Sequence, residues 1–324
     1  MAFFAELSNG HTLAMSGSIN TVEASRDGQR IDNYLFTLLK GVPKGLIYRL
    51  LRTGKIRVNG KRVKQTYRIQ EADEIKIPNL EVSQNAPATI SERVKHLVNE
   101  SILYEDDHIL AINKPAGLAV HPGSGVSFGV IEVLRAIRPN EAFLELVHRL
   151  DKETSGCLLL AKDKHTLNEL HDLLRDNDVN KKYQLLVKGQ WNLENKTINT
   201  PLQTKGQNDI DDKKNSWKEA HTVFMPEKYY SGFTLLTAKI KTGRTHQIRI
   251  HAAQTGFPVV GDNKYGDFAF NRECKKMGLK RMFLHAEEIS FDLASASDRF
   301  LIKAPLPNEL MAFIEGLEQR KEHS

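Results

Sequence analysis

The sequence predicts an α+β protein, in which a small N-terminal α+β module precedes a larger domain built on a mixed, mainly antiparallel β-sheet. Apolar segments of strand length dominate after residue 101, and helical patterns do not alternate with them regularly, as they would in a doubly wound fold. Residues 28–77 instead carry two helical patterns followed by short strands. At 324 residues, the chain is long enough for one large and one small domain.

Residues 1–20 are expected to be a disordered extension, or the product of an early start codon, because Met15 could also begin the chain. They lack the positive leader and the apolar run of a secretory signal. No segment approaches the roughly 20 apolar residues that a membrane helix needs. The two cysteines, Cys157 and Cys274, lie far apart in the sequence and fit reduced thiols. We therefore expect a cytoplasmic protein that does not enter a membrane.

Two helices are expected at the start of the N-terminal module. The first carries apolar residues at helical spacing on one face, namely Ile31, Tyr34, Leu35, Leu38 and Leu39. Gly41 ends this helix, and Pro43 suits the first position of the second. The apolar side of the second helix consists of Leu46, Ile47, Leu50 and Leu51. Gly54 closes the second helix.

Short strands are expected to complete the module. Residues 56–58 and 61–63 flank Asn59-Gly60, a pair that fits the type I′ turn of a tight hairpin. Residues 73–77 predict a further strand, ended by Pro78. The module is therefore expected to span residues 21–80. Residues 81–100 are rich in Asn, Ser, Gln and Pro and predict a linker to a domain of residues 101–324.

The positive charge of the chain is concentrated in this module. Residues 28–77 hold 12 Lys and Arg against 4 Asp and Glu, an excess of eight, whereas the whole chain has a net charge of +6. A compact, patterned segment with such a balance predicts contact with phosphates. The candidate RNA-binding residues are Lys44, Arg49, Arg52, Lys55, Arg57, Lys61 and Arg62. Over about 50 residues the module resembles the S4 RNA-binding domain; the alternative is a positively charged but inert folding module.

The larger domain is expected to be mainly strands. Strands are predicted at residues 102–104, 109–112, 144–150, 157–161, 183–187 and 233–240, and helices at 167–174 and 306–317. Three clusters of polar side chains are placed among them. The first lies in residues 145–156, where an apolar strand enters a loop that carries Arg149 and Asp151. A carboxylate at a strand end can act as a nucleophile, a base or a structural anion, so Asp151 alone is ambiguous.

The other two clusters supply possible partners for a carboxylate. In residues 241–251, Thr245 is expected to cap a helix whose buried face includes Ile248, Ala252 and Thr255. Arg249 lies beside that face and could pair with a buried carboxylate and keep it ionised, or form only a weak surface ion pair. Tyr183 leads into a strand and could belong to the core or stack on a base.

In order along the chain, several motifs together resemble the RluA-type pseudouridine synthases. They are Asn113-Lys114-Pro115, residues 119–123 (Ala-Val-His-Pro-Gly), 148–156 (His-Arg-Leu-Asp to Gly), Lys182-Tyr183, 243–251, 256–258 and 261–266. The resemblance covers nearly the whole chain, and the His-Arg-Leu-Asp loop is highly specific. Residues 28–33 and 41–44 look closest to members that modify bacterial large-subunit ribosomal RNA. The resemblance therefore implies the pseudouridine synthase fold and an isomerase of ribosomal RNA.

The family pattern implies a role for five residues. Asp151 matches the aspartate that initiates cleavage of the uridine C1′–N1 bond, and Tyr183 matches the tyrosine that stacks on the base and takes up a proton. Arg249 matches the arginine paired with the aspartate. Arg149 is expected to hold the flipped nucleotide, and Leu284 to pack against the target base. One departure from the family pattern is Trp217-Lys218-Glu219-Ala220, which lacks the glycine that relatives usually have there. The charged residues 209–214 just before it are expected to form an exposed loop. We expect these differences to affect which RNA is bound more than the chemistry.

The resemblance implies a protein that isomerises uridine after base flipping and needs no metal, redox cofactor or nucleotide; we also expect a monomer. The main alternative is a non-catalytic RNA-binding or ribosome-assembly factor, which the basic module would serve equally well. Residues 54–62 do not form a phosphate loop, because Gly60 is one residue too late and Arg62 replaces the Ser or Thr. A zinc deaminase is excluded for lack of the His-x-Glu and Cys-x-x-Cys pairing.

Overall fold

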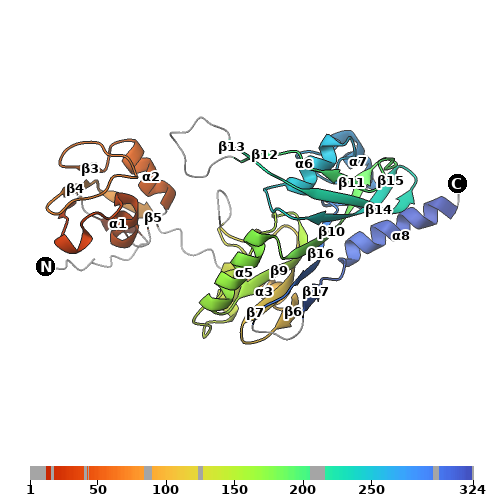
Figure 1. Cartoon of the computed structure of the whole chain (residues 1–324), viewed down its shortest axis with the longest axis horizontal. Helices are drawn as coiled ribbons and strands as arrows, with labels where there is room; N and C mark the ends of the chain where they lie inside the picture. The colour runs from red at the N-terminus through yellow and green to blue at the C-terminus, as the bar shows by residue number, and fades with distance from the viewer. Residues whose placement is uncertain are drawn as a thin grey trace. The chain divides into compact units, whose positions relative to one another are not determined.

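The computed structural model describes residues 12–15, 18–39, 42, 44–83, 90–122, 127–204, 216–294 and 299–322. The chain divides into two compact units, Met1–Thr89 and Ile90–Ser324 (Figure 1). Among the helices within these residues, none is both long and apolar enough to cross a membrane.

The N-terminal unit packs two helices on a small sheet. Helices α1 (Ile31–Leu38) and α2 (Lys44–Arg52) confirm the two predicted helices; Gly41 and Pro43, expected at their ends, lie outside the described residues. A short 3-10 helix, Ala24–Arg26, precedes them. The apolar faces meet in one core, to which the helices contribute Ile31, Leu35, Ile47, Leu50 and Leu51, and the residue after α1 contributes Leu39. Gly54 has a φ of +68° and ends the α2 region, as predicted.

The sheet of this unit has the antiparallel order β2 (Ser18–Thr21), β4 (Glu74–Ile77), β3 (Arg57–Val58). Asn59 and Gly60 both have positive φ values, +50° and +74°, as a type I′ turn requires. Val58 and Lys61 exchange two backbone hydrogen bonds of 2.9 Å across the turn. The second strand expected at 61–63 is only an isolated bridge at Lys61, because β3 pairs with β4 instead.

Two expected boundaries differ from the structure. Residues 1–20 were expected to form no structure, but β1 (Thr12–Met15) pairs with β5 (Leu80–Ser83), and β2 begins at Ser18. The linker expected at 81–100 contains the end of β5 and helix α3 (Glu92–Asn99). Val98 of α3 is fully buried in the core of the C-terminal unit, so this helix belongs to that unit.

The C-terminal unit is built on a ten-stranded, mainly antiparallel sheet, which confirms the predicted fold class (Figure 1). Its main path runs β11-β14-β15-β10-β16-β9-β7-β6, with β17 added to β16 and β8 to β9, and only β16 and β9 are parallel. The strands are β6 (Ile102–Glu105), β7 (Ile109–Lys114), β8 (Glu145–Leu146), β9 (Ser155–Ala161), β10 (Asn180–Lys188), β11 (Lys196–Ile198), β14 (Thr222–Tyr230), β15 (Phe233–Ile240), β16 (Leu284–Phe291) and β17 (Phe300–Lys303). A separate ribbon pairs β12 (Leu202–Thr204) with β13 (Ser216–Lys218).

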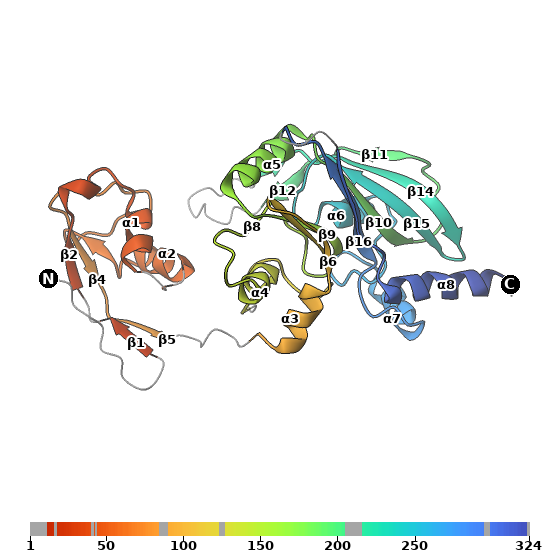
Figure 2. The same ribbon diagram turned by 90° about the horizontal axis from the view of Figure 1, so that it is seen from below.

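Both faces of the sheet are covered by helices. Alternate strand residues point to opposite faces, so Leu110 and Ile112 join one core and Ile109 and Ala111 another. The first face packs against α3, α4 (Val130–Ile137) and α6 (Gln247–Gln254). The second packs against α5 (Lys164–Asp176), α7 (Phe268–Lys276) and α8 (Asn308–Glu322). Figure 2 shows α5 and the α3–α4 pair on opposite sides of β9. Burial of both faces explains why the central strands are continuous apolar runs.

Two local predictions for this unit were wrong. The strand expected at 144–150 is reduced to β8, Glu145–Leu146, because the chain leaves the sheet to form the loop that carries Asp151. Thr245 was expected to cap the helix at 247–254, but the cap residue is His246, with a left-handed φ of +58°. Ile248 and Ala252 are buried, as predicted, whereas Thr255 lies only partly buried after the helix end.

Candidate active site

One pocket brings together all five residues singled out in the larger domain. Arg149, Asp151, Tyr183, Arg249 and Leu284 all line it, although up to 135 positions separate them in the chain. The pocket holds about 500 Å³ of space not filled by atoms, including its open mouth. Its remaining lining residues come from three places. Leu150 and Thr154 lie between β8 and β9, and Ile240 ends β15. The others lie in the loop between β15 and α6 and at the start of α6: Gly243, Arg244, Thr245, His246, Gln247 and Ile248.

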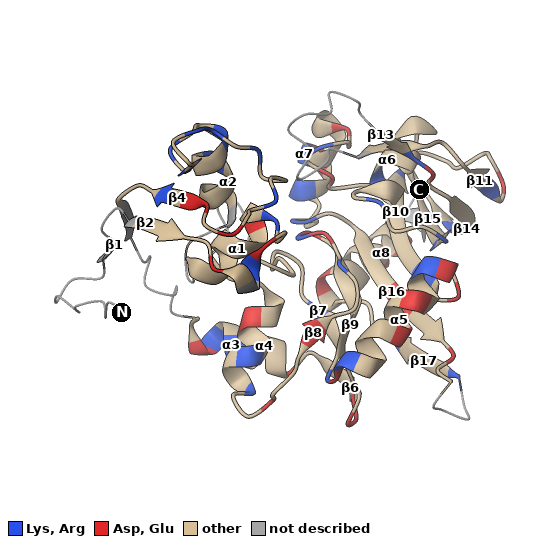
Figure 3. Ribbon diagram, turned by 60° about the vertical axis from the view of Figure 1, so that its left-hand side comes forward, with Lys and Arg blue, Asp and Glu red and all other residues tan. Residues whose placement is uncertain are grey.

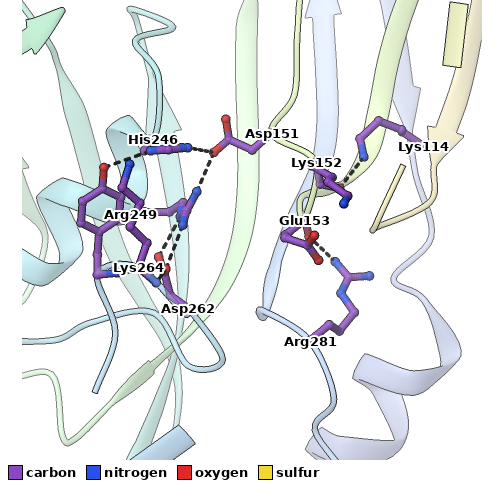
Figure 4. A network of polar contacts seen from close by, with 10 residues as sticks. Lys114, Asp151, Lys152, Glu153, His246, Arg249, Asp262, Lys264 and Arg281 are labelled. Carbon is purple, nitrogen blue, oxygen red and sulfur yellow. Dashed lines mark hydrogen bonds and ion pairs between the residues drawn. The ribbon is translucent and has the colours of Figure 1, made fainter. Parts of the chain in front are cut away.

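Asp151 lies in the loop between β8 and β9, and buried cations fix this loop from both sides (Figure 4). On one side, Nζ of Lys114 donates to the carbonyl oxygen of Lys152 at 3.2 Å, and to those of Pro115 and Leu118 at 2.8 and 2.9 Å. Lys114 is fully buried, and burial lowers its pKa to about 7, with the charge of Arg281 acting in the same direction. Its three acceptors match the three protons of an ammonium group, so the side chain is held at three points of the backbone.

On the other side, Arg281 holds the end of the same loop. Its Nη2 donates to the carbonyl oxygen of Glu153 at 3.2 Å and to Oγ of Ser155 at 2.9 Å. Ser155 in turn contacts Nδ1 of the buried His285 at 2.9 Å. Burial lowers the pKa of His285 to about 4, so this ring is neutral near pH 7. The loop around Asp151 therefore has little freedom to move.

Arg249 joins Asp151 to a second carboxylate. Its Nε and Nη2 donate to the two carboxylate oxygens of Asp262 at 2.7 and 2.8 Å, a bidentate pair. Its Nη1 donates to Oδ2 of Asp151 at 3.2 Å. The side chain of Asp262 is fully buried, that of Arg249 is 10% exposed, and that of Asp151 is 20% exposed at the pocket surface. The pairing is thus a buried one, and the alternative of a weak surface ion pair is wrong.

The electrostatics of this arrangement favour the charged forms of the cation and its anchor. Burial alone would lower the pKa of Arg249, but its hydrogen bonds and charge interactions with Asp262 and Asp151 raise it overall. Burial would raise the pKa of Asp262, but the hydrogen bond from Arg249 and those from the backbone N–H groups of Lys264 and Tyr265 lower it overall. Arg249 is also held over the ring of Tyr265, 5.2 Å from its centre.

His246 places an imidazole beside the same carboxylate. Its Nε2 lies 3.8 Å from Oδ2 of Asp151, and its Nδ1 is 3.0 Å from the hydroxyl of Tyr265 (Figure 4). Burial lowers the pKa of His246, which the charge of Asp151 only partly offsets. The left-handed backbone that this residue adopts is unfavourable for a side chain other than glycine, and such strain is common at functional sites.

Gln247 fixes the loop that leads into α6. This side chain is 3% exposed and uses its whole amide: Oε1 accepts from Oγ1 of Thr242 and from the backbone N–H of Arg244, and Nε2 donates to the carbonyl oxygen of His221 and to Oγ1 of Thr222. These bonds tie the pocket wall to the start of β14.

The apolar side of the pocket comes from neighbouring strands. Tyr183 of β10 pairs with Ala286 of β16 in register, and Leu284 is two residues earlier on the same strand. Both are almost buried, at 7% and 3% exposure, and both line the pocket. Tyr183 thus belongs to the core and also presents a surface to the pocket. Burial, and then the charge of Asp151, raise the pKa of Tyr183, so its phenol is protonated near pH 7.

Arg149 lies at the pocket with its side chain exposed, and forms no ion pair with any residue in the described part of the chain. The candidate RNA-binding residues of the N-terminal unit share this property. Arg49, Arg52, Lys55, Arg57, Lys61 and Arg62 are all exposed, and within the described ranges none of them pairs with a carboxylate. The side chain of Lys44 lies outside the described residues. Figure 3 shows Lys and Arg along the α2 region of this unit.

Several residues of the site carried no assigned role in the sequence. Asp262 and Tyr265 belong to a motif that was recognised without a function, and His246 lies in the 241–251 cluster. The sequence pointed to these residues only through their nearness to Arg249 along the chain. Their contacts with Arg249 depend on the fold, which brings the turn at 261–266 against α6. Across the residues that the structure describes, no group of three or more His, Cys, Asp or Glu side chains is placed to hold a metal ion.

Comparison with known proteins matches both units. The model of the RNA pseudouridylate synthase family matches residues 108–254, and that of the S4 domain matches residues 29–75. The ribosomal large subunit pseudouridine synthase C of Salmonella typhi is 44% identical over 312 residues, which is 94% of this chain and 98% of that protein. The enzyme of the same name from Escherichia coli K12 is 43% identical over 313 residues, with the same coverage of each chain.

Solved structures agree in fold. Human RNA pseudouridylate synthase domain containing 4 superimposes with a TM-score of 0.58 and 25% identity, covering 70% of this chain and 96% of that one. Human RNA pseudouridylate synthase domain containing 1 superimposes with a TM-score of 0.53 over 69% of this chain and 95% of that one. At 23% identity, this second likeness concerns the fold alone.

Proposed function

The chain belongs to the RNA pseudouridylate synthase family, and on that premise we propose that it converts specific uridines of large-subunit (23S) ribosomal RNA to pseudouridine. The chain is an isomerase that acts on ribosomal RNA, and its N-terminal unit is an S4 domain. The observation that carries the proposal is the position of Asp151, which lies in the pocket at 3.2 Å from the buried guanidinium of Arg249. Binding to RNA alone would not need a carboxylate held in this way.

The target nucleotide must leave its stack before it can react, at a cost of a few kcal/mol. The apolar walls made by Tyr183, Leu284 and Ile240 can receive its base. Arg149, exposed at the same pocket and without a carboxylate partner in the described chain, can bind a phosphate of the extruded nucleotide. Both features support base flipping as the first step.

Asp151 then initiates cleavage of the C1′–N1 bond. The bond breaks, the base turns within the pocket, and C5 forms a new bond to C1′; N1 gains a proton and C5 loses one. Arg249 supplies a permanent positive charge beside Asp151, and Asp262 prevents that charge from moving away. The reaction is redox-neutral, so it requires no redox cofactor.

Tyr183 stacks on the base and takes part in the transfer of the C5 proton. Because its phenol is protonated near pH 7, it cannot act as a phenolate base. It can accept a proton only while it passes its own proton on, and we therefore assign it the role of a relay.

The exposed cations of the S4 domain bind RNA phosphates and so bring the substrate to the enzyme. We also propose that the enzyme acts as a monomer. Its ribosomal RNA substrate would place it in the cytoplasm.

Pseudouridine mapping in large-subunit ribosomal RNA tests this function. Cells that lack the protein should lose pseudouridine at a small set of uridines, and the wild-type protein should restore it. Asp151→Asn should restore none of it. Asp107→Asn, which alters an exposed aspartate of the same unit outside the pocket, should restore all of it. Unchanged sites in the deletion, or restoration by Asp151→Asn, would contradict the proposal.

The alternative, a non-catalytic RNA-binding or assembly factor, predicts a different result. In that case purified protein would bind ribosomal RNA and leave its uridines unchanged, and Asp151→Asn would behave like the wild type in every assay.

A further inference from the structure

Trp217 is the most exposed large apolar side chain in the part of the chain that the structure describes, at 67%. Single exposed apolar residues are common on protein surfaces, so exposure alone makes no site. The position of this residue and the charges around it carry the argument.

Trp217 lies on the ribbon formed by β12 and β13. In the antiparallel register it is opposite Gln203, and the two share a face of the ribbon. Leu202, which precedes Gln203 on β12, is 4% exposed and points to the protein interior. The alternation therefore turns the indole of Trp217 outward, away from the core that anchors the ribbon.

The end of this ribbon is fastened to the active-site pocket. Two residues after Trp217, the carbonyl oxygen of Glu219 accepts a hydrogen bond of 3.0 Å from Nε of Arg244, which lines the pocket. The backbone N–H of His221 donates to Oγ1 of Thr242 at 3.0 Å. Two residues of extended chain span roughly 7 Å. Trp217 is therefore within reach of a nucleotide close to the one in the pocket.

The surroundings of Trp217 are positively charged. Lys218 follows it on the strand and Lys241 bonds through its backbone N–H to the carbonyl oxygen of His221; both side chains are exposed. Neither they nor Arg244 form an ion pair with a residue in the described ranges. Glu219 is the one exposed carboxylate between Trp217 and Thr222. An aromatic face among unpaired cations is the arrangement that binds single-stranded nucleic acid.

We propose that Trp217 stacks on an unpaired RNA base next to the target uridine, and so selects substrates in which that neighbour is free to unstack. This inference rests on the proposed function. When the target leaves its stack, the neighbouring base loses one stacking partner, and the indole replaces it. Since every base has an aromatic face, the site selects RNA by local structure and not by base identity.

The fluorescence of the two tryptophans offers a direct test. Trp191 is 2% exposed, so Trp217 accounts for quenching by acrylamide in the full-length protein. A large-subunit ribosomal RNA fragment that the enzyme modifies should protect the wild-type protein from acrylamide, and the Trp217→Phe variant should show little quenching with or without RNA. Unprotected Trp217 in the presence of saturating RNA would overturn the inference. Protection that appears without RNA as protein concentration rises would also overturn it, because a second copy of the chain would then cover the residue.

Kinetics separate this inference from the proposed function. Trp217→Ala should raise KM for RNA by about five- to a hundredfold, the effect of one stacked base, with kcat unchanged. Trp217→Phe should recover most of the loss, because a phenyl ring also stacks. Tyr229→Ala, which removes an aromatic residue that is 42% exposed on β14, should leave KM unchanged. An active Trp217→Ala enzyme with the wild-type KM would refute the role of Trp217 and leave the proposed function intact. A wild-type protein that forms no pseudouridine would refute the proposed function itself.

Discussion

Asp262 holds Arg249 by two hydrogen bonds of 2.7 and 2.8 Å, and this leaves Nη1 of the guanidinium to reach Asp151. The orientation of Arg249, the partner of the proposed catalytic carboxylate, is therefore set by Asp262, whose side chain is completely buried and does not line the pocket. We expect this pair to matter both for folding and for the rate of the reaction.

Asp262→Asn should lower the rate of pseudouridine formation by about 10- to 100-fold, because Arg249 loses its anchor and shifts relative to Asp151. It should also lower the free energy of unfolding by about 3 kcal/mol, since a buried cation loses its partner. Single-turnover kinetics and chemical denaturation measure the two effects. Asp172→Asn is the matched control, because Asp172 pairs with Arg175 on the surface, where an ion pair contributes less than about 1 kcal/mol. If the two variants behave alike, Asp262 does not have this role.

Gly156 allows the parallel strands β9 and β16 to meet beside the loop that carries Asp151. Its φ is +115°, and a Cβ there would lie 2.2 Å from the carbonyl oxygen of Ala286. Gly156→Ala should therefore lower the free energy of unfolding by at least about 3 kcal/mol. Gly316→Ala in α8 should act in the opposite direction and raise it by about 0.5–1 kcal/mol, because that glycine has open space around it. Thermal unfolding of both variants checks this pair, and a stable Gly156→Ala protein would contradict it.

Stability should fall as the pH is lowered from 7 to 5. Burial lowers the pKa of His148 and His285 to about 4, so between pH 6.5 and 4 the unfolded chain binds protons that the folded chain does not. The stabilisation is fully present above pH 6.5 and is lost toward pH 4, by about 2 kcal/mol for each residue at pH 5. The pKa values of His246 and His251 are lowered in the same direction.

Denaturant unfolding at several pH values measures this slope. The double variant His148→Gln, His285→Gln should give a flatter profile than the wild type between pH 7 and 5. A profile that is equally steep in both proteins would show that other groups are responsible.

The exposed cations of the S4 domain should govern the salt dependence of RNA binding. Replacing Lys55, Lys61 and Arg62 by alanine should reduce the slope of log K against log salt by about 2, because each lost phosphate contact contributes about 0.7 for single-stranded RNA. Alanine at Lys164, Lys275 and Lys280, exposed lysines that do not line the active-site pocket, is the control and should change the slope much less. An equal reduction in both variants would count against a specific role for this surface.

The sequence predicted secondary structure best where burial leaves a clear pattern of apolar residues. The apolar run at 109–112 and the helix pair of the N-terminal unit were predicted because each element buries a whole face or side. The strand predicted at residues 144–150 was too long for the same reason. Val147 and Leu150 are buried although they lie beyond the end of β8, and Val147 donates one further backbone hydrogen bond to Leu159 of β9, so the segment has the composition of a longer strand.

The site was predictable by family motif and only weakly by local chemistry. Asp151 and Arg249 are brought together by the pairing of distant strands, which no local pattern encodes. His246 could not be predicted as a helix cap, because capping preferences favour the neighbouring Thr245 and a left-handed histidine depends on tertiary contacts such as that with Tyr265. Asp262 was ambiguous because its partner is defined only by the fold.

The most direct test of the central claim compares wild-type protein and Asp151→Asn on the same large-subunit ribosomal RNA transcript, with binding and pseudouridine formation measured on each. The wild type should form pseudouridine at defined uridines. Asp151→Asn should bind the RNA with closely similar affinity and form pseudouridine at least about 1000-fold more slowly, as expected when the group that starts the reaction is lost. A variant that binds RNA and retains the wild-type rate would contradict the assignment of Asp151 as the catalytic carboxylate.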